Sequence, residues 1–519
     1  MLEVLSAMHL TTTCYGALPD CLHMHSIQAL IAPPGAGKTT WLINHLQSNR
    51  HQHSILAFPT KHLSAEVQRR LSVICLAFNA IDSDTVDGFV IQCLEQSLAN
   101  RTDKIIICTH ASLSLIKADT LNGWHLYIDE VPTTWDCDTL NFSELSYRAV
   151  VETFAELAAE SENRLTIKQD RKKLIEDLAI QTDSALSSDA RKLLKILLDE
   201  RYIVEVDKLD SKQIRTVRIV GIKHYIPAFE AAEATIIMGA EIEKMLFGVI
   251  LKGAGWTIEP IDAKLDFRGY GNRITIHPFL AANKNYSKSN ALIKHGKLLD
   301  HYENGCLLDE WLTQDVFRII GSQKAILVAH SWCNPKLPIT ENGQSNIARL
   351  KIDSRGINEY DDYSIAICLQ HGNLTPIENS RSIPSLARML TLQREITPSD
   401  IRDAIKYERL YESTLQSVCR TALRSQSHTS DIMLFVQDHN VAKFLSDQLG
   451  NCKIDETHSM AVITAESEAK ITRNRSIQKA IMLNDLGHDT KYIAAQLDKH
   501  EKTVKNWLKP YLQLKAIQE

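Results

Sequence analysis

The segment best suited to chemistry is APPGAGKTT, residues 32–40, which lies between a short apolar run and a helical pattern. Its glycines let the backbone turn tightly, so that successive N–H groups can point at phosphate oxygens. Lys38 can then place its charge on the β- and γ-phosphates, and the Thr39 hydroxyl can ligate Mg²⁺. The candidate nucleotide-binding residues are Pro34, Gly35, Ala36, Gly37, Lys38, Thr39 and Thr40.

A second candidate group is the acidic pair Asp129 and Glu130, which follows the apolar run 126–128. A nucleotide-hydrolysing site needs a carboxylate for the metal and a base for the attacking water. We expect Asp129 to hold Mg²⁺, directly or through water, and Glu130 to orient and deprotonate the water. Together with residues 32–40, the pair predicts a site that binds ATP and Mg²⁺, with Lys38 and Glu130 as catalytic residues.

Eight short apolar runs are the elements that must position these residues. They are residues 27–31, 55–58, 105–108, 126–128, 236–238, 325–328, 365–368 and 432–436. Runs this short and this apolar are typical of strands buried on both faces, and their alternation with helical patterns indicates parallel sheets. The sequence therefore predicts an α/β protein with two parallel-sheet domains.

The pattern changes twice along the chain, which gives the expected domain boundaries. Charged amphipathic helices at about 136–209 predict a helical insertion within a first domain, 1–255, that carries both candidate groups. A second parallel-sheet domain is expected at 256–465. The remainder, 466–519, is helical, and residues 470–519 contain ten Lys and Arg against five Asp and Glu. A basic tail on a chain of net charge −5 indicates a nucleic-acid contact there, or a solvated helical face.

Composition excludes several classes of protein. The chain has 519 residues, of which 44% are hydrophobic and 23% charged, as in a soluble globular protein rather than a disordered one. No run of 18 apolar residues could span a membrane, and the segment around Glu3 lacks the basic start of a secretory signal. Eleven cysteines without a C-x-x-C pair argue against a disulfide framework or a zinc ribbon. We therefore expect a cytoplasmic protein.

The order of these segments resembles superfamily 2 helicases, which have a DExx box and two RecA-like domains. Residues 58–61, FPTK, resemble the family's P-T-x-x-L segment with Leu63 in place, and 107–110, ICTH, resemble its next backbone-contacting segment. Residues 238–240, MGA, stand where the family has S-A-T, which couples hydrolysis to movement. The resemblance implies that nucleic acid is contacted by Pro59, Thr60, Lys61, Thr109 and His110.

The second domain continues the resemblance. Residues 354–358, SRGIN, resemble the R-G-I-D segment, which implies a nucleotide contact at Gly356. Residues 416–424 resemble Q-x-x-G-R-x-x-R, with Arg420 as the candidate arginine finger and the next arginine one position late, at Arg424. On one helix these two would be i, i+4 neighbours that could both reach the γ-phosphate. The helicases of phages and mobile elements are the nearest type, rather than the DEAD-box RNA helicases.

The C-terminal region contains two short helical patterns, 489–497 and 502–508, joined by residues 498–501. They resemble a helix-turn-helix, in which Ile493, Ala494, Leu497, Val504 and Trp507 would form the core. The second helix would expose Lys502, Lys505 and Asn506 to phosphates and base edges. The alternative is a small helical cap or an oligomerisation hairpin.

These expectations combine into one function. The sequence predicts an ATP-dependent nucleic-acid helicase or translocase with two RecA-like domains, acting on DNA. The alternatives are an RNA-remodelling ATPase stimulated by nucleic acid, and a DNA-binding protein that uses ATP only to switch conformation. The sequence does not predict an oligomeric state.

Overall fold

The computed structural model describes the chain as two compact units. The first, unit 1, is Met1–Phe267 with Leu374–Glu408, and the second, unit 2, is Arg268–Asn373 with Arg409–Glu519. Within them, the described residues are 25–86, 88–180, 186–210, 213–223, 225–282, 284–352, 359–375, 378–390, 396–425, 430–462 and 465–518. None of the helices in these ranges has the length and apolar character that a membrane span requires. Both units contain a parallel sheet covered by helices, so the predicted α/β class is confirmed.

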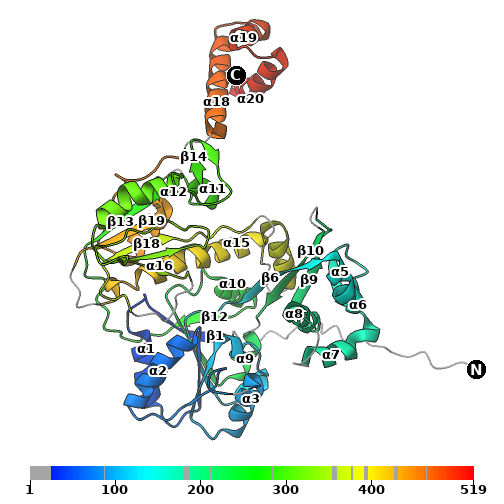
Figure 1. The fold of residues 1–519 in the computed structure, drawn as a ribbon, viewed down its shortest axis with the longest axis vertical. Coiled ribbons are helices and arrows are strands. Elements are labelled where there is room, and N and C mark those ends of the chain that lie inside the picture. The colour runs from blue at the N-terminus through cyan, green and yellow to red at the C-terminus, as the bar shows by residue number, and fades with distance from the viewer. Residues whose placement is uncertain are drawn as a thin grey trace, which may run out of the picture. The chain divides into compact units, whose positions relative to one another are not determined.

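Unit 1 is built on a seven-stranded parallel sheet with helices on both faces (Figure 1). Side chains of the strand Ser54–Phe58 alternate between the two faces of the sheet. Ile55 and Ala57 belong to the apolar cluster on one face, and Leu56 and Phe58 to the cluster on the other. Helices α1 and α2 cover one face, and α3, α9 and α10 cover the opposite face. In sheet order the strands are β12 (Thr257–Pro260), β1 (Ser26–Ile31), β11 (Ala234–Gly239), β5 (His125–Asp129), β2 (Ser54–Phe58), β4 (Ile105–Thr109) and β3 (Asn79–Ala80). The helices are α1 (Lys38–Ser48), α2 (Lys61–Val73), α3 (Val90–Asn100), α4 (His110–Leu113), α9 (Ile226–Ala231) and α10 (Leu246–Gly253).

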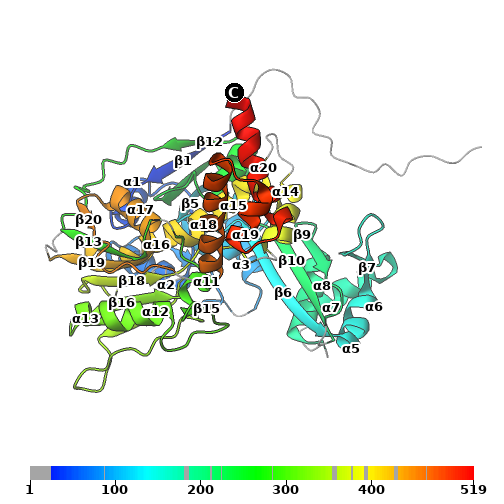
Figure 2. The same cartoon turned by 90° about the horizontal axis from the view of Figure 1, so that it is seen from above.

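The insertion between β5 and β11 is a five-stranded antiparallel sheet with helices packed on it (Figure 2). The sequence pattern predicted helices alone. These strands were missed although Leu140, Asn141 and Phe142, in the first of them, alternate between buried and exposed, a pattern typical of a half-buried strand. In sheet order they are β6 (Trp135–Ser143), β10 (Ile214–Ile222), β9 (Tyr202–Val206), β8 (Arg164–Ile167) and β7 (Ala155–Leu157). The helices are α5 (Glu144–Ser146), α6 (Glu152–Phe154), α7 (Lys172–Ile180) and α8 (Ser188–Leu197).

The segment Leu374–Glu408 belongs to unit 1, although the sequence pattern predicted it in the second domain. Its helices are α14 (Ile383–Met389) and α15 (Pro398–Lys406), which follow a π-helical segment, Glu378–Ser382. Ile383 and Leu386 share an apolar cluster with Val220 and Ile222 of β10. The segment is therefore part of the core that supports the insertion.

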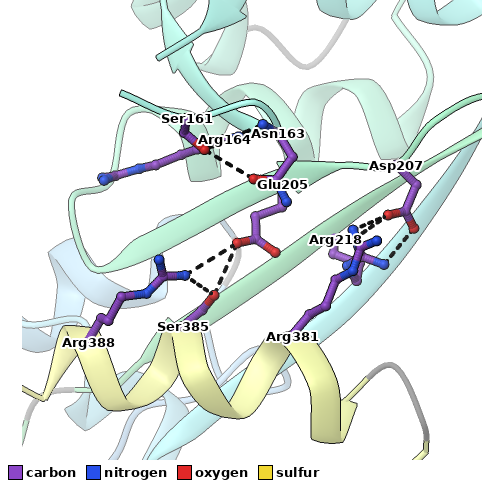
Figure 3. A network of polar contacts seen from close by, with 9 residues as sticks. All are labelled: Ser161, Asn163, Arg164, Glu205, Asp207, Arg218, Arg381, Ser385 and Arg388. Atoms are coloured by element: carbon purple, nitrogen blue, oxygen red, sulfur yellow. Dashed lines mark hydrogen bonds and ion pairs between the residues drawn. The ribbon is translucent and has the colours of Figure 1, made fainter. Parts of the chain in front are cut away.

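A polar network flanks this core (Figure 3). Arg218, which is 2% exposed, forms an ion pair with Asp207, and Asp207 also accepts a 2.6 Å bond from Arg381. Beside this ion pair, the buried carboxylate of Glu205 accepts a 3.1 Å hydrogen bond from the Ser385 hydroxyl. Charged groups of the insertion are thus satisfied by side chains of the returning segment, as buried charges must be.

Unit 2 contains a six-stranded parallel sheet, with α12 and α13 on one face and α16 and α17 on the other (Figure 2). The sheet order is β17 (Ile347–Leu350), β16 (Ala325–Ala329), β18 (Ile365–Leu369), β19 (Ile432–Asp438), β13 (Ile274–Leu280) and β20 (Cys452–Ile454), and a separate hairpin joins β14 (Ile293–Lys294) to β15 (Lys297–Leu298). The helices are α11 (Lys288–Ala291), α12 (Leu307–Glu310), α13 (Phe317–Ile320), α16 (Ser413–Val418) and α17 (His439–Leu449). Every residue of β16 and β18 is buried, as expected for central parallel strands.

The C-terminal part of unit 2 consists of three helices, α18 (Ala465–Asp485), α19 (Thr490–Leu497) and α20 (Glu501–Gln518). The Asp489 side chain accepts a hydrogen bond from the Tyr492 amide and so starts α19, and Asp498, the residue after α19, has a left-handed backbone. The two helices predicted from the sequence are confirmed. Their small core contains Ala480, Ile493, Ala494, Val504 and Leu508, with Leu497 and Trp507 packed against it.

Candidate functional site

The predicted phosphate loop joins the end of β1 to the start of α1. Gly35 and Gly37 have φ values of 81° and 89°, which residues with a Cβ rarely adopt. The Lys38 ammonium group donates hydrogen bonds to the carbonyls of Ala32 (2.7 Å) and Pro33 (3.1 Å). The segment therefore folds as the expected tight turn and holds the lysine charge against its own carbonyls, and the contact of Lys38 with phosphate stays a prediction.

The two predicted metal ligands lie together. Thr39 Oγ1 donates to Asp129 Oδ2 across 3.4 Å, and Asp129 is 3% exposed. A Mg²⁺ ion bound to both oxygens at about 2.1 Å in octahedral geometry would hold them about 3 Å apart, so these two residues fit the ion. Within the described ranges, no three or more His, Cys, Asp and Glu side chains are grouped to hold a metal. Such a site would therefore use two protein oxygens together with phosphate and water, as Mg²⁺ commonly does.

The order of the strands explains why these segments meet. β11 lies between β1 and β5, and its register pairs Gly239 with Ile31 on one side and Met238 with Asp129 on the other. The amide of Ala32, the first residue of the loop, donates to the Gly239 carbonyl at 3.0 Å. Both halves of the site thus lie at the carboxyl edge of one parallel sheet, where α/β proteins place their ligands.

Gly239 leaves no room for a side chain. A Cβ built on it would lie 2.9 Å from side-chain carbons of both Ile242 and Val131, closer than such atoms approach. Residues 238–240 stand where helicases of superfamily 2 have S-A-T, and the coupling role that this position implies stays a prediction. The packing accounts for the glycine independently of that role.

Glu130, the predicted base, has an unusual backbone. Its φ is 63°, in the left-handed region, and its side chain is half-buried. The left-handed region costs a residue other than glycine, asparagine or aspartate about 1–2 kcal/mol. Strain of this kind persists only where the surrounding structure imposes it, and it concentrates at functional sites.

Side chains that were not predicted from the sequence surround α1. Arg70 Nη2 donates to Thr40 Oγ1 at 2.9 Å, which holds the hydroxyl of the last predicted nucleotide-binding residue. His45 stacks on Trp41 and lies 3.1 Å from the Tyr127 hydroxyl. Burial, and to a lesser degree the nearby His125, lowers the pKa of His45, and burial raises the pKa of Tyr127 to about 12. The i, i+4 spacing of Trp41 and His45 is the one sequence signal for this contact.

Three of the predicted nucleic-acid contacts follow β2, and one ends β4. Thr60 accepts a 3.2 Å hydrogen bond from the Leu63 amide and caps α2, and Thr109 caps α4 in the same way. Lys61 pairs with Asp84 at the surface, and Pro59 is half-buried. The two threonine hydroxyls therefore have a structural role in starting helices, and nucleic-acid contacts at Pro59, Thr60, Lys61 and Thr109 stay predictions.

His110 is more deeply buried than the other predicted nucleic-acid contacts of unit 1. The residue is 7% exposed, and its Nε2 lies 3.1 Å from the carbonyl oxygen of Asp129. The Tyr225 hydroxyl donates to the His110 carbonyl at 3.3 Å. The imidazole is thus turned inward, toward the acidic pair, and the nucleic-acid contact expected of His110 stays a prediction.

The two candidate arginines of unit 2 do not share a helix face. α16 ends at Val418, and the Ala422 amide donates to Tyr363 rather than to the preceding turn, so the helix cannot continue. Arg420 lies in the turn that follows and is 5% exposed, whereas Arg424 is exposed on a 3-10 helix, Ala422–Arg424. The expected i, i+4 pairing is wrong because tertiary pairing overrides the helical pattern.

Two further predictions concern unit 2. Gly356 lies outside the described residues. Lys502, Lys505 and Asn506 are all exposed on the first turns of α20, as predicted. Lys505 forms a 2.8 Å ion pair with Glu501 one turn earlier, and hydrogen bonds from Lys505 and then Thr490 lower the pKa of Glu501. An exposed pair of this kind is weak enough to be exchanged for a phosphate.

Comparison with known proteins gives fold-level likeness only. No protein-family model matches the chain, and no curated protein matches it. Among solved structures it is similar to S. tokodaii Xpd4, with 9% identity and a TM-score of 0.47 over 83% of this chain and 96% of that one. It is also similar to S. cerevisiae Dbp5 bound to RNA and ADP BeF3, with 10% identity and a TM-score of 0.33 over 84% and 85%. At these identities and TM-scores, a function for this chain has to be inferred from its own residues.

Proposed function

We propose that the chain is an ATP-dependent nucleic-acid helicase or translocase that acts on DNA. The observation that carries the proposal is the contact between Thr39 and Asp129, which joins a glycine-rich phosphate loop to an acidic pair at one sheet edge. A loop with two left-handed glycines, a lysine and a hydroxyl suits a nucleoside triphosphate. The adjacent carboxylates supply the metal ligand and the base that hydrolysis needs.

Each residue has a distinct part in the hydrolysis. The loop amides and Lys38 bind and orient the β- and γ-phosphates, and Thr39 and Asp129 would hold Mg²⁺, which neutralises phosphate charge when bound. Glu130 accepts a proton from the attacking water. Arg420 and Arg424 are the candidates to stabilise charge on the γ-phosphate in the transition state, and Gly356 to contact the nucleotide.

The helicase assignment adds nucleic-acid contacts to this ATPase. Pro59, Thr60, Lys61 and Thr109 are the candidates in unit 1 to contact the strand backbone. Lys502, Lys505 and Asn506 are exposed together on α20, above a small apolar core, as a helix that enters a DNA groove requires. This exposed basic helix is what favours DNA over RNA.

The proposal is tested by measuring ATP hydrolysis with single-stranded, forked and duplex forms of both DNA and RNA. We expect hydrolysis to be stimulated more strongly by DNA, and multiple turnovers of strand separation on the forked substrate. Stimulation by RNA alone would instead indicate an RNA-remodelling ATPase. Hydrolysis without strand separation or movement would indicate a DNA-binding switch.

A further inference from the structure

His110 follows the end of β4 and makes a contact that nucleic-acid binding does not explain. Its Nε2 lies 3.1 Å from the Asp129 carbonyl oxygen, and the side chain is buried. A carbonyl oxygen only accepts hydrogen bonds, so Nε2 must carry the proton and donate it. The tautomer of His110 is therefore fixed by this contact.

The contact spans the end of an intervening strand. β4 and β5 are not neighbours, because β2 lies between them in the sheet. Two strand spacings amount to about 9.6 Å, so the imidazole reaches over the point where β2 ends. The register between β2 and β5 ends at the pair of Ala57 and Ile128, so Asp129 lies one residue past the last pair on that side. His110 thus supplies a donor beyond the end of the strand ladder.

The bonded carbonyl belongs to the peptide group that carries the Glu130 amide. A peptide group is planar, so a hydrogen bond that holds the Asp129 oxygen also holds the direction of the bond from the Glu130 nitrogen to its Cα. Glu130 then leaves this plane with a φ of 63°. The imidazole is placed to stabilise the strained backbone that sets the direction of the Glu130 carboxylate.

His110 is itself held from two sides. Thr109 accepts the Ser112 amide at 3.2 Å and so fixes the start of α4, whose first residue is His110. The hydroxyl of Tyr225, a buried residue, donates to the His110 carbonyl at 3.3 Å. Burial raises the pKa of Tyr225, which keeps its hydroxyl protonated and able to donate.

We infer that His110 is a positioning residue for ATP hydrolysis, acting through the peptide group between Asp129 and Glu130. It orients the carboxylate that accepts the proton from water and does not touch the nucleotide. The inference rests on the proposed function, since it assigns a role within that site.

Two substitutions of His110 by side chains of similar size distinguish the effect of its hydrogen bond from the effect of the volume it fills. His110→Gln keeps an N–H donor at the end of an unbranched side chain, and His110→Met fills similar volume without a donor. We expect His110→Met to lower kcat for ATP hydrolysis roughly 10- to 100-fold, the loss typical of a misplaced catalytic group. His110→Gln should recover most of that loss. The dissociation constant for a fluorescent ATP analogue and the affinity for single-stranded DNA should both stay at the wild-type value.

A double-mutant cycle shows whether His110 acts through Glu130. In the Glu130→Gln background, His110→Met should lower kcat no further, because the group it orients is already lost. The control is His51→Ala, which removes an exposed imidazole from the turn after α1 and should leave kcat unchanged.

The outcomes are distinguishable. Equal kcat values in His110→Gln and His110→Met, whether both normal or both reduced, would contradict the inference. A loss of DNA affinity with normal kcat at saturating DNA would contradict the inference and support a nucleic-acid contact at His110 instead. Absence of ATP hydrolysis in the wild-type protein would contradict the proposed function itself. A kcat that is the same in the wild type and in both His110 variants would contradict this inference alone.

Discussion

The Thr39 hydroxyl lies 3.4 Å from the Asp129 carboxylate, although the two residues are 90 positions apart in the chain. Thr39 is the second residue of α1, and Asp129 is the last residue of β5. The parallel sheet brings them together, because β1 and β5 flank β11 and all three end at the same edge. The order of the strands thus brings two short segments together as one candidate phosphate and metal site.

The arginines of unit 2 give the first prediction. Arg420→Ala should lower kcat for DNA-stimulated hydrolysis by about 10³-fold if it acts as an arginine finger. Because Arg420 is 5% exposed, the unfolding temperature must be measured beside kcat. Arg424→Ala removes an exposed side chain, so its unfolding temperature should not change. Normal kcat in both variants would mean that neither arginine serves the nucleotide site.

The polar network between the insertion and the returning segment gives the second prediction. Arg218→Ala should lower the free energy of unfolding by about 3 kcal/mol, because it leaves Asp207 without its buried partner. Arg381→Ala is the matched control on the same carboxylate. Its side chain is 46% exposed, so the loss should be about 1 kcal/mol or less. Urea denaturation of the two variants checks this order, and equal losses would contradict it.

The eight apolar runs predicted eight strands correctly, since strands buried on both faces are continuously apolar. β13 was missed because His277 and Pro278 interrupt its apolar residues. Proline is tolerated there because the β20 ladder ends at Ile276, so that ladder requires no N–H donor from Pro278. The parallel sheets were thus predictable from hydrophobicity, whereas strands that depend on tertiary pairing were not.

The site was predictable in its residue types but less so in its geometry. Lys38, Thr39 and Asp129 follow from local spacing, because a loop and a strand end place them directly. The inward turn of His110 and the left-handed backbone of Glu130 depend on the order of three strands and on side chains that meet over them. No local pattern carries that information, so the sequence did not predict the contact between His110 and the Asp129 carbonyl.

The third prediction concerns pH. Burial lowers the pKa of His45, so below about pH 6.5 the unfolded chain takes up a proton that the folded chain does not. The free energy of unfolding should therefore fall as the pH drops from 6.5 through the folded-state pKa. His45→Gln should make this dependence shallower, and His51→Gln, an exposed control, should not. Identical pH profiles for His45→Gln and wild type would contradict the assignment.

The C-terminal helices give the fourth prediction. Deleting residues 466–519 should leave ATP hydrolysis intact, since the phosphate loop and acidic pair lie in unit 1. Duplex DNA binding should weaken, and the slope of log K against log salt should fall by about 0.9 for each phosphate that the protein no longer neutralises. Substituting Lys505 and Asn506 with alanine should weaken binding in part without unfolding the helices, because both side chains are exposed. Unchanged affinity and slope would make the region a structural cap.

The most direct test of the account is ATP binding and hydrolysis measured together for wild type, Lys38→Ala and Glu130→Gln. Lys38→Ala should lose hydrolysis and bind ATP more weakly, because the cation on the β- and γ-phosphates is gone. Glu130→Gln should bind ATP as wild type does while turnover falls by about 10²–10⁴-fold, the usual cost of losing a general base. Wild-type hydrolysis in Lys38→Ala, or loss of binding rather than turnover in Glu130→Gln, would contradict the assignment of this site.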